Sequence, residues 1–175
     1  ADGSVAVKFL SVSKDEKYMA YGLSKSGSDW TEIHVMELAS KKLLKDHIKW
    51  VKFSGVSWFK NGFYYSGYTP PVKGSEFAAK NEFNKVYYHQ LETAQEQDKI
   101  VFETPEHPNR SHYAKVSDDE KFLIITSSEG TSGNLFHVQT LDQPNEPPVQ
   151  FVEHFDNETY FIGNMEDRMY FVTNF

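Results

Sequence analysis

The histidines are the first candidates for chemistry, because imidazole binds metals and exchanges protons near neutral pH. Three of the seven fall at one position of a repeating unit, inside segments that we interpret as third strands: His34, His89 and His137. Equivalent positions of neighbouring units lie a sheet's width apart, too far for one ion with bonds of about 2.0–2.1 Å. His107 and His112 are loosely spaced and have no carboxylate pattern beside them. We therefore predict packing or surface histidines, with no metal site and no cofactor.

A nucleophilic serine needs a sharp turn such as Gly-x-Ser-x-Gly and a base within reach. Gly130–Asn134 is the nearest match and fails at its last position. Its repeat counterpart is the turn at Ser24–Asp29, so we interpret it as a turn as well. The acidic run Asp118–Glu120 could be a cation site or an acid/base pair, but Lys14–Glu16 occupies the same repeat position, and aspartate favours turns. We therefore predict no catalytic residue in this chain.

These turns belong to a pattern that occurs more than once. Ser13–Trp30 passes from an acidic turn through an aromatic strand into a Ser/Gly turn, and the same order returns about 104 residues later, from Ser117. A rougher copy starts at Ser57 and a fourth at Tyr160. A repeat of roughly 45–60 residues with several short strands is typical of a β-propeller, one blade per repeat. We predict an all-β fold, a partial β-propeller of about three and a half four-stranded antiparallel blades.

We expect residues 1–175 to form part of one propeller domain, with blades at approximately 6–54, 55–103 and 112–155 and an incomplete blade at 158–175. In the first blade the pattern predicts strands at Ala6–Ser13, Tyr18–Leu23, Trp30–Leu38 and Ile48–Phe53, with a basic turn at Lys41–Lys45. The second blade is interrupted at Thr69–Asn84, and an insertion of this length is usually mobile or functional. Three and a half blades are too few to close a ring. We therefore expect exposed edge strands near Ala6 and Phe175, and self-association of the chain through these edges.

Composition excludes several partners. A net charge of -7 argues against nucleic acid, and no apolar run approaches the roughly 20 residues that span a bilayer. The absence of cysteine excludes disulfides and thiolate chemistry but leaves both a cytoplasmic and a periplasmic location open. The chain opens at Ala1 rather than Met, stops at Phe175 inside an expected strand and shows no leader, so we predict a piece of a larger protein.

Five segments, in order and with nearly the same spacing, resemble the propeller of prolyl oligopeptidases. They are Ala20–Ser24 running into Ser26–Trp30, Val51–Ser54, Tyr87–His89, Phe102–Glu103 with Pro105–Pro108, and Val116–Asp119. The resemblance covers essentially the whole chain. It implies a parent serine peptidase that cleaves short peptides after proline, with a seven-bladed propeller over an α/β-hydrolase domain that carries a Ser, Asp and His triad. The chain has no such domain, so we expect it to be inactive by itself.

The resemblance also implies a role for a few positions. The propeller would limit substrate size and contribute walls to the substrate cavity, and Thr69–Asn84 would correspond to a loop that gates access. Phe53 keeps the family's substrate-contacting phenylalanine, whereas Ser111 stands where the family has methionine and Val138 where it has cysteine. Trp30, Trp50 and Trp58 are better explained by blade packing than by ligand stacking. The alternative function is a non-catalytic propeller that serves as a platform for protein interactions.

Overall fold

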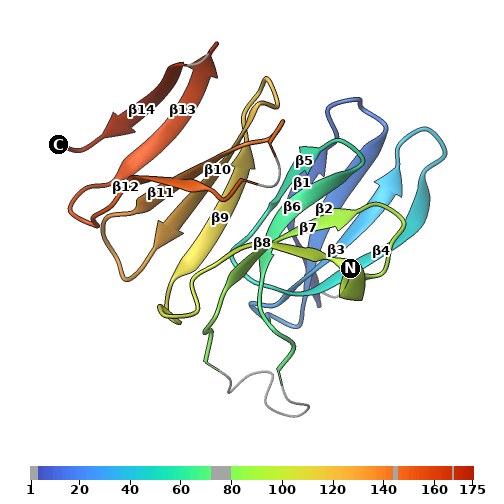
Figure 1. Cartoon of the computed structure of the whole chain (residues 1–175). Coiled ribbons are helices and arrows are strands. Elements are labelled where there is room, and N and C mark those ends of the chain that lie inside the picture. Colours follow the sequence, from blue (N-terminus) through green and yellow to red (C-terminus); the bar gives the residue numbers. More distant parts are fainter. Residues whose placement is uncertain (1–3, 72–79, 144–145, 167) are drawn as a thin grey trace.

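The computed structural model describes residues 4–71, 80–143, 146–166 and 168–175. In that part of the chain the strands form four antiparallel sheets of four, four, four and two strands (Figure 1). The sheets follow one another in chain order, and in the first three each strand pairs with its sequence neighbours. The expected all-β architecture of three four-stranded units and one incomplete unit is confirmed.

The strands have the following bounds. Sheet 1 contains β1 (Val5–Val12), β2 (Tyr18–Lys25), β3 (Thr31–Glu37) and β4 (Lys42–Val51). Sheet 2 contains β5 (Val56–Phe59), β6 (Gly62–Gly67), β7 (Lys85–Gln90) and β8 (Lys99–Glu103), with a 3₁₀ turn, η1 (Gln95–Gln97), before β8. Sheet 3 contains β9 (Ser111–Val116), β10 (Phe122–Ser128), β11 (Leu135–Thr140) and β12 (Val149–Val152), and sheet 4 is the hairpin of β13 (Thr159–Met165) and β14 (Arg168–Thr173). Among the described residues, no helix has the length and apolarity to cross a bilayer.

The repeated acidic turn has the same hydrogen bonds in sheets 1 and 3. The Ser13 hydroxyl donates to Asp15 Oδ1 at 2.7 Å and accepts from the Tyr18 amide at 2.9 Å. In sheet 3, Ser117 donates to Asp119 at 2.7 Å and accepts from the Phe122 amide at 3.0 Å. Each aspartate is therefore used to close the turn between the first two strands of its sheet, which confirms the turn interpretation.

Apolar side chains fill the spaces between successive sheets. One buried cluster joins sheet 1 to sheet 2, with Ile33, Val35 and Ile48 on one side and Phe63 and Tyr65 on the other. A second joins sheet 2 to sheet 3 through the side chains of Tyr64, Val86, Ala114, Val116, Leu123 and Ile125. The facing sides of sheets 1 and 2, and of sheets 2 and 3, are thus buried against each other, as in a stack of blades.

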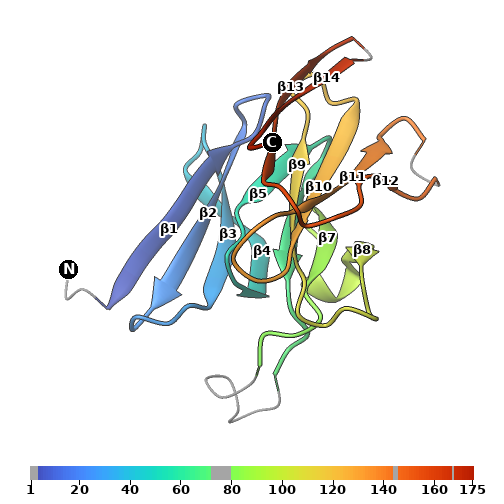
Figure 2. The same cartoon turned by 90° about the vertical axis from the view of Figure 1, so that its left-hand side faces the viewer.

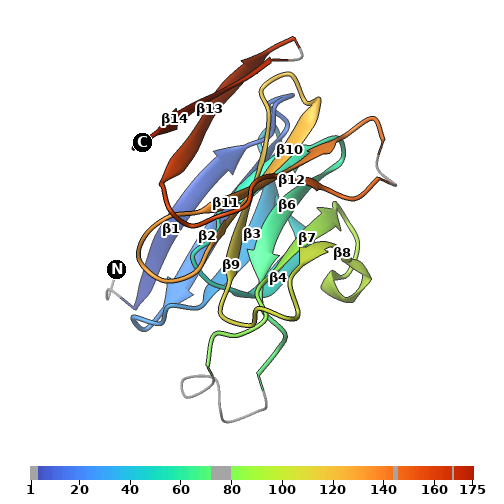
Figure 3. The same ribbon diagram turned by 60° about the vertical axis from the view of Figure 1, so that its left-hand side comes forward.

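The hairpin of sheet 4 packs on sheet 3 less completely. Phe171 contacts Phe136 edge-on, with ring centroids 5.5 Å apart. Beside this contact lies a cavity of about 1050 Å³, whose apolar walls include Phe122, Val138, Leu141, Phe151 and Phe171. Figure 3 shows the hairpin standing at one end of the molecule, beyond sheet 3.

In sheet 1 the largest difference from the sequence-based prediction is at the start of β4; the other predicted strand ends differ by one or two residues at most. Lys41–Lys45 was expected to be a turn, but β4 already starts at Lys42 and runs for ten residues. The turn is shorter because Glu37 pairs directly with Lys42, and two irregularities in the β3–β4 register absorb the extra length. The third strand begins at Thr31 rather than at Trp30. Of the interruption at Thr69–Asn84, residues 72–79 lie outside the described part of the chain.

Candidate functional site

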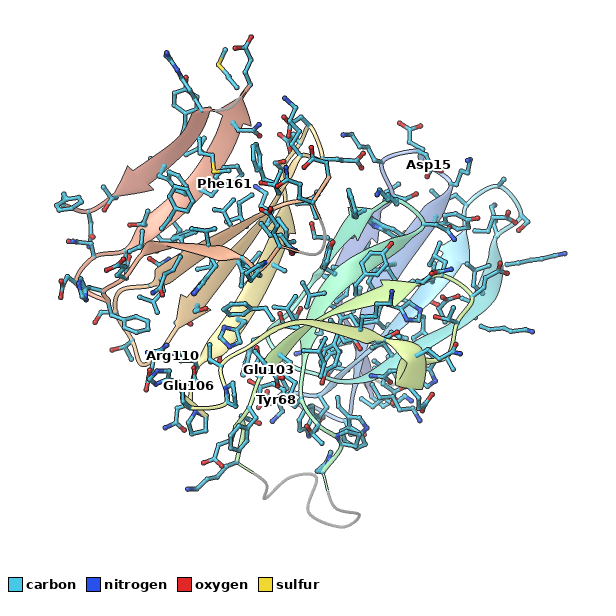
Figure 4. All side chains as sticks on the ribbon, viewed as in Figure 1. Asp15, Tyr68, Glu103, Glu106, Arg110 and Phe161 are labelled. Carbon is cyan, nitrogen blue, oxygen red and sulfur yellow. The ribbon has the colours of Figure 1, made fainter. Side chains whose placement is uncertain are left out.

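Several expected site residues lie at one end of the sheets. We define the loop end as the end that carries the connections β4–β5, β6–β7 and β8–β9; it lies at the bottom of Figure 1. Phe53 is in the first connection, and Ser111 starts β9 directly after the third. Figure 4 shows Tyr68 and Arg110 at this end and Asp15 at the opposite end. The acidic turns are therefore remote from the expected substrate wall.

Phe53 is held in an exposed position by its backbone. Its φ of +53° is in the left-handed region, which turns the chain sharply after β4, and its side chain is 78% exposed. The ring borders a small pocket of about 300 Å³ whose other walls are Lys8, Phe9, Asp29, Thr31, Ser54 and Gly55. An exposed phenylalanine beside a pocket can contact an apolar ligand without any rearrangement of the core.

An aromatic cluster supports the backbone on which Phe53 sits. Trp30 makes edge-on contacts with Trp50 and with Tyr68, at centroid distances of 5.4 and 5.9 Å. The Lys52 ammonium lies 4.1 Å from the Trp30 ring centroid and donates to the Asn81 side chain at 3.0 Å. At the other end of the sheets Trp58 packs against Phe63. These contacts agree with the interpretation of the tryptophans as packing residues.

Ser111 and Val138 are placed differently by the fold. Ser111 is exposed and pairs with Ser128, so it lies at the loop end. Val138 is in the middle of β11, is 6% exposed and faces the cavity beside sheet 4. Through Ile124 it is level with Lys115, four residues along β9 from Ser111, which corresponds to about 13 Å along the strand. The structure therefore does not bring Val138 to the surface that carries Phe53.

Two asparagines that sequence reasoning missed join consecutive sheets at the loop end. Asn84 accepts a hydrogen bond from the His112 amide at 2.8 Å and donates to the Gly67 carbonyl. Asn134 makes both of its bonds to one residue of the next sheet: it accepts from the Thr159 amide at 2.8 Å and donates to the Thr159 carbonyl at 2.7 Å. Each stands directly before the third strand of its sheet, where sheet 1 has Trp30. Repeat alignment of that single position could have identified both residues.

A serine–histidine pair lies within sheet 3, on the neighbouring strands β9 and β10. Ser127 Oγ is 2.8 Å from His112 Nδ1, and Thr104 Oγ1 is 3.1 Å from His112 Nε2. Burial, with smaller contributions from the nearby His137 and Arg110, lowers the pKa of His112 to about 4, so the ring is neutral. Ser127 is completely buried, and among the described residues no carboxylate is hydrogen-bonded to the ring, so the pair links β9 to β10, and through Thr104 to the end of β8, rather than presenting a nucleophile.

A second buried histidine joins sheets 1 and 2. His89 is fully buried between two carboxylates, with Nδ1 2.6 Å from Asp98 and Nε2 2.9 Å from Asp46. Burial by itself lowers the pKa of His89, but the hydrogen bonds and charges of Asp46 and Asp98 raise it more, to about 9. Tyr65 donates to the second oxygen of Asp98 at 2.7 Å. The charged network is a structural joint, in agreement with the prediction that His89 is a packing residue.

Stacked four-stranded antiparallel sheets in chain order, with the same acidic turn in sheets 1 and 3, define the chain as part of a β-propeller. The family model of the prolyl oligopeptidase N-terminal β-propeller domain matches residues 1–175. The chain belongs to this family, as its sequence motifs indicated.

Individual relatives agree with that membership. The chain is 31% identical to a prolyl endopeptidase of Elizabethkingia meningoseptica over 98% of its own length and 24% of the relative's. It is 32% identical to prolyl oligopeptidase A of Amanita bisporigera, with coverages of 99% and 26%. A solved prolyl oligopeptidase B of Galerina marginata, bound to a 35-residue hydrolysis and macrocyclization substrate, superimposes with a TM-score of 0.88 at 30% identity, covering 99% of this chain and 26% of that one. The chain thus spans about a quarter of the length of the relatives it matches.

Proposed function

We propose that the chain is the propeller part of a serine peptidase that cleaves short peptides on the carboxyl side of proline. The observation that carries the proposal is the match of the whole chain to the prolyl oligopeptidase propeller, together with relatives named prolyl endopeptidase. The triad would belong to an α/β-hydrolase domain in the same protein, and bond cleavage would proceed by acyl transfer through its serine. Proline-containing peptides are the proposed substrates.

Within that enzyme the propeller would restrict access and form part of the cavity wall. Phe53 supports this role because it is exposed at the loop end and borders a pocket, whereas Ile48 and Val51 near the end of the preceding strand are buried. Ser111 lies at the same end, on the first residue of β9. The connection from β6 to β7 also leaves from this end, so the proposed gate and wall would face the same space.

The test is hydrolysis of a chromogenic glycyl-proline substrate by the full-length protein that contains this chain, with the chain alone measured in parallel. We expect turnover by the full-length protein and its loss after treatment with a serine-directed phosphonylating inhibitor. Triad residues supply about 10⁶-fold in rate in a serine peptidase, so the chain alone should show no turnover. An inactive but folded full-length protein would reject the peptidase proposal and favour the interaction platform.

A further inference from the structure

Three side chains capable of metal ligation meet on the face of sheet 1 that points away from sheet 2. Glu32 and His34 are two residues apart on β3, so both project from the same face. Their neighbour Ile33 points to the buried cluster between the sheets, which places Glu32 and His34 on the opposite face. His47 on β4 pairs directly with His34 in the strand register. Figure 2 shows sheet 1 at one side of the molecule, with no described segment over this face.

The potential ligand atoms are already close together. Glu32 Oε2 is 2.9 Å from His47 Nε2 and 3.9 Å from His34 Nε2. One ligand atom from each residue lies within 4.8 Å of the others. Ligands of a tetrahedral zinc ion with bonds of about 2.0–2.1 Å are about 3.3 Å apart, so small side-chain rotations bring all three within bonding distance.

We propose that Glu32, His34 and His47 form a binding site for a divalent transition-metal ion, with Zn²⁺ as the ion that fits the donors best. Two imidazoles and one carboxylate are a donor set that zinc uses when a fourth position stays open to water. The site would link β3 to β4 across the sheet. Imidazole nitrogens disfavour Mg²⁺ and Ca²⁺, which prefer oxygen ligands.

Two features of the metal-free arrangement must change when the ion binds. The His34 and His47 rings are stacked, with centroids 4.6 Å apart and planes at 17°, so one ring has to turn for both lone pairs to converge. The Lys25 ammonium is 3.0 Å from the same Glu32 oxygen and has to leave. Both changes are feasible, because the His47 and Lys25 side chains are 38% and 60% exposed and an exposed ion pair contributes little.

Calorimetric titration of ZnCl₂ into the protein, stripped of metal, tests the site. We expect one strong site, and an affinity more than about tenfold weaker in Glu32→Gln and in His47→Gln. His154→Gln is the matched control, because His154 is exposed but lies outside the cluster, and it should keep wild-type affinity. Substitution by Co²⁺ should give the visible absorption of a four-coordinate ion, and Zn²⁺ should raise the melting temperature of the wild type.

Lys25→Leu gives a prediction of opposite sign. Removing the competing ammonium should strengthen Zn²⁺ binding severalfold. If Lys25 had no part in the site, the substitution would leave the Zn²⁺ affinity unchanged. The proposal is overturned if no strong Zn²⁺ site is found, or if Glu32→Gln and His47→Gln bind as tightly as His154→Gln does. All of these side chains are at least partly exposed, so the variants should fold, and circular dichroism spectra identical to that of the wild type establish this.

Discussion

Phe53 is the residue at which the proposed peptidase role can be tested most directly. A ring that contacts the substrate equally in the ground state and the transition state contributes uniform binding, so its removal raises KM without lowering kcat. In the full-length enzyme we expect Phe53→Ala to raise KM about three- to tenfold and to leave kcat nearly unchanged. Steady-state kinetics with a proline-containing peptide measures both constants.

Phe151→Ala is a suitable control for Phe53→Ala. Phe151 is 62% exposed, close to the 78% of Phe53, but it lies beside sheet 4 rather than at the loop end. It should leave both constants unchanged. A large loss of kcat at constant KM in Phe53→Ala would contradict the wall role, because it would mean that the ring acts only in the transition state.

His89 should make the stability of the fold depend on pH. Its pKa is about 9 in the folded protein and 6.5 for the free side chain, so protonation favours folding. The stabilisation is fully present below about pH 6.5 and is lost as the pH rises through about 9; a difference of this size corresponds to about 3 kcal/mol. Urea unfolding at a series of pH values should show the free energy of unfolding falling across this window.

Asp46→Asn isolates the contribution of His89. The change keeps the side-chain volume and removes one of the two carboxylates that raise the pKa of His89, so stability should fall less steeply between pH 6.5 and 9. His154→Gln, at an exposed position, should retain the wild-type slope. If Asp46→Asn and the wild type had the same slope, the pH dependence would come from other groups.

At the scale of elements, two glycines in one turn allow the energetic cost of a strained backbone conformation to be measured separately from that of a steric clash. Gly130 and Gly133 lie between β10 and β11 and have φ of +85° and +71°. A Cβ on Gly130 would meet nothing within 4 Å, whereas on Gly133 it would lie 1.9 Å from the Phe155 carbonyl oxygen. We expect Gly130→Ala to cost about 1 kcal/mol and Gly133→Ala more than about 3 kcal/mol in urea unfolding. Equal losses of unfolding free energy in the two variants would mean that the β12–β13 connection moves away from the added Cβ at no energetic cost.

The strands could be predicted from sequence where a local signal marks both ends. The Ser13 and Ser117 turns have side chains that bond the neighbouring backbone, so the strands after them start where the pattern indicates. The start of β4 was missed because Lys42–Lys45 resembles a solvated turn, and only pairing with β3 shows it to be a strand. The His34–His47 pair depends on that irregular register, so the candidate metal cluster could not be predicted.

The site was predictable only in part, for a similar reason. Phe53 and Ser111 were named from matching to the family, and their substrate role is a proposal; that both lie at the loop end is visible only in the structure. Val138 was named through the same family match, at a position where the family has a cysteine, and its place in the middle of β11, away from the strand end at which Ser111 lies, follows only from the strand pairing. The Asp46–His89–Asp98 joint brings together residues from two sheets, and nothing local in the sequence links Asp46 to His89.

At the scale of the whole molecule, the two terminal sheets leave apolar surface exposed. On sheet 4, Tyr160, Ile162 and Val172 are between 54% and 60% exposed, and on β1 Val7 and Leu10 are 61% and 64% exposed. A two-stranded hairpin is marginally stable by itself, and β14 has a free edge in the described structure. Such an edge can pair with a strand of another molecule. We propose that the chain associates with itself through these surfaces.

Light scattering over a range of concentrations tests this association. We expect a dimer or larger assembly for the chain and a shift toward monomer in Val172→Lys, because a charge on β14 opposes edge pairing. Ile100→Lys is the matched control: Ile100 is 49% exposed but belongs to sheet 2, which is packed between sheets 1 and 3, so it should leave the association unchanged. A monomer at high concentration would refute the proposal. An assembly that Ile100→Lys dissociates and Val172→Lys does not would place the contact on sheet 2 instead.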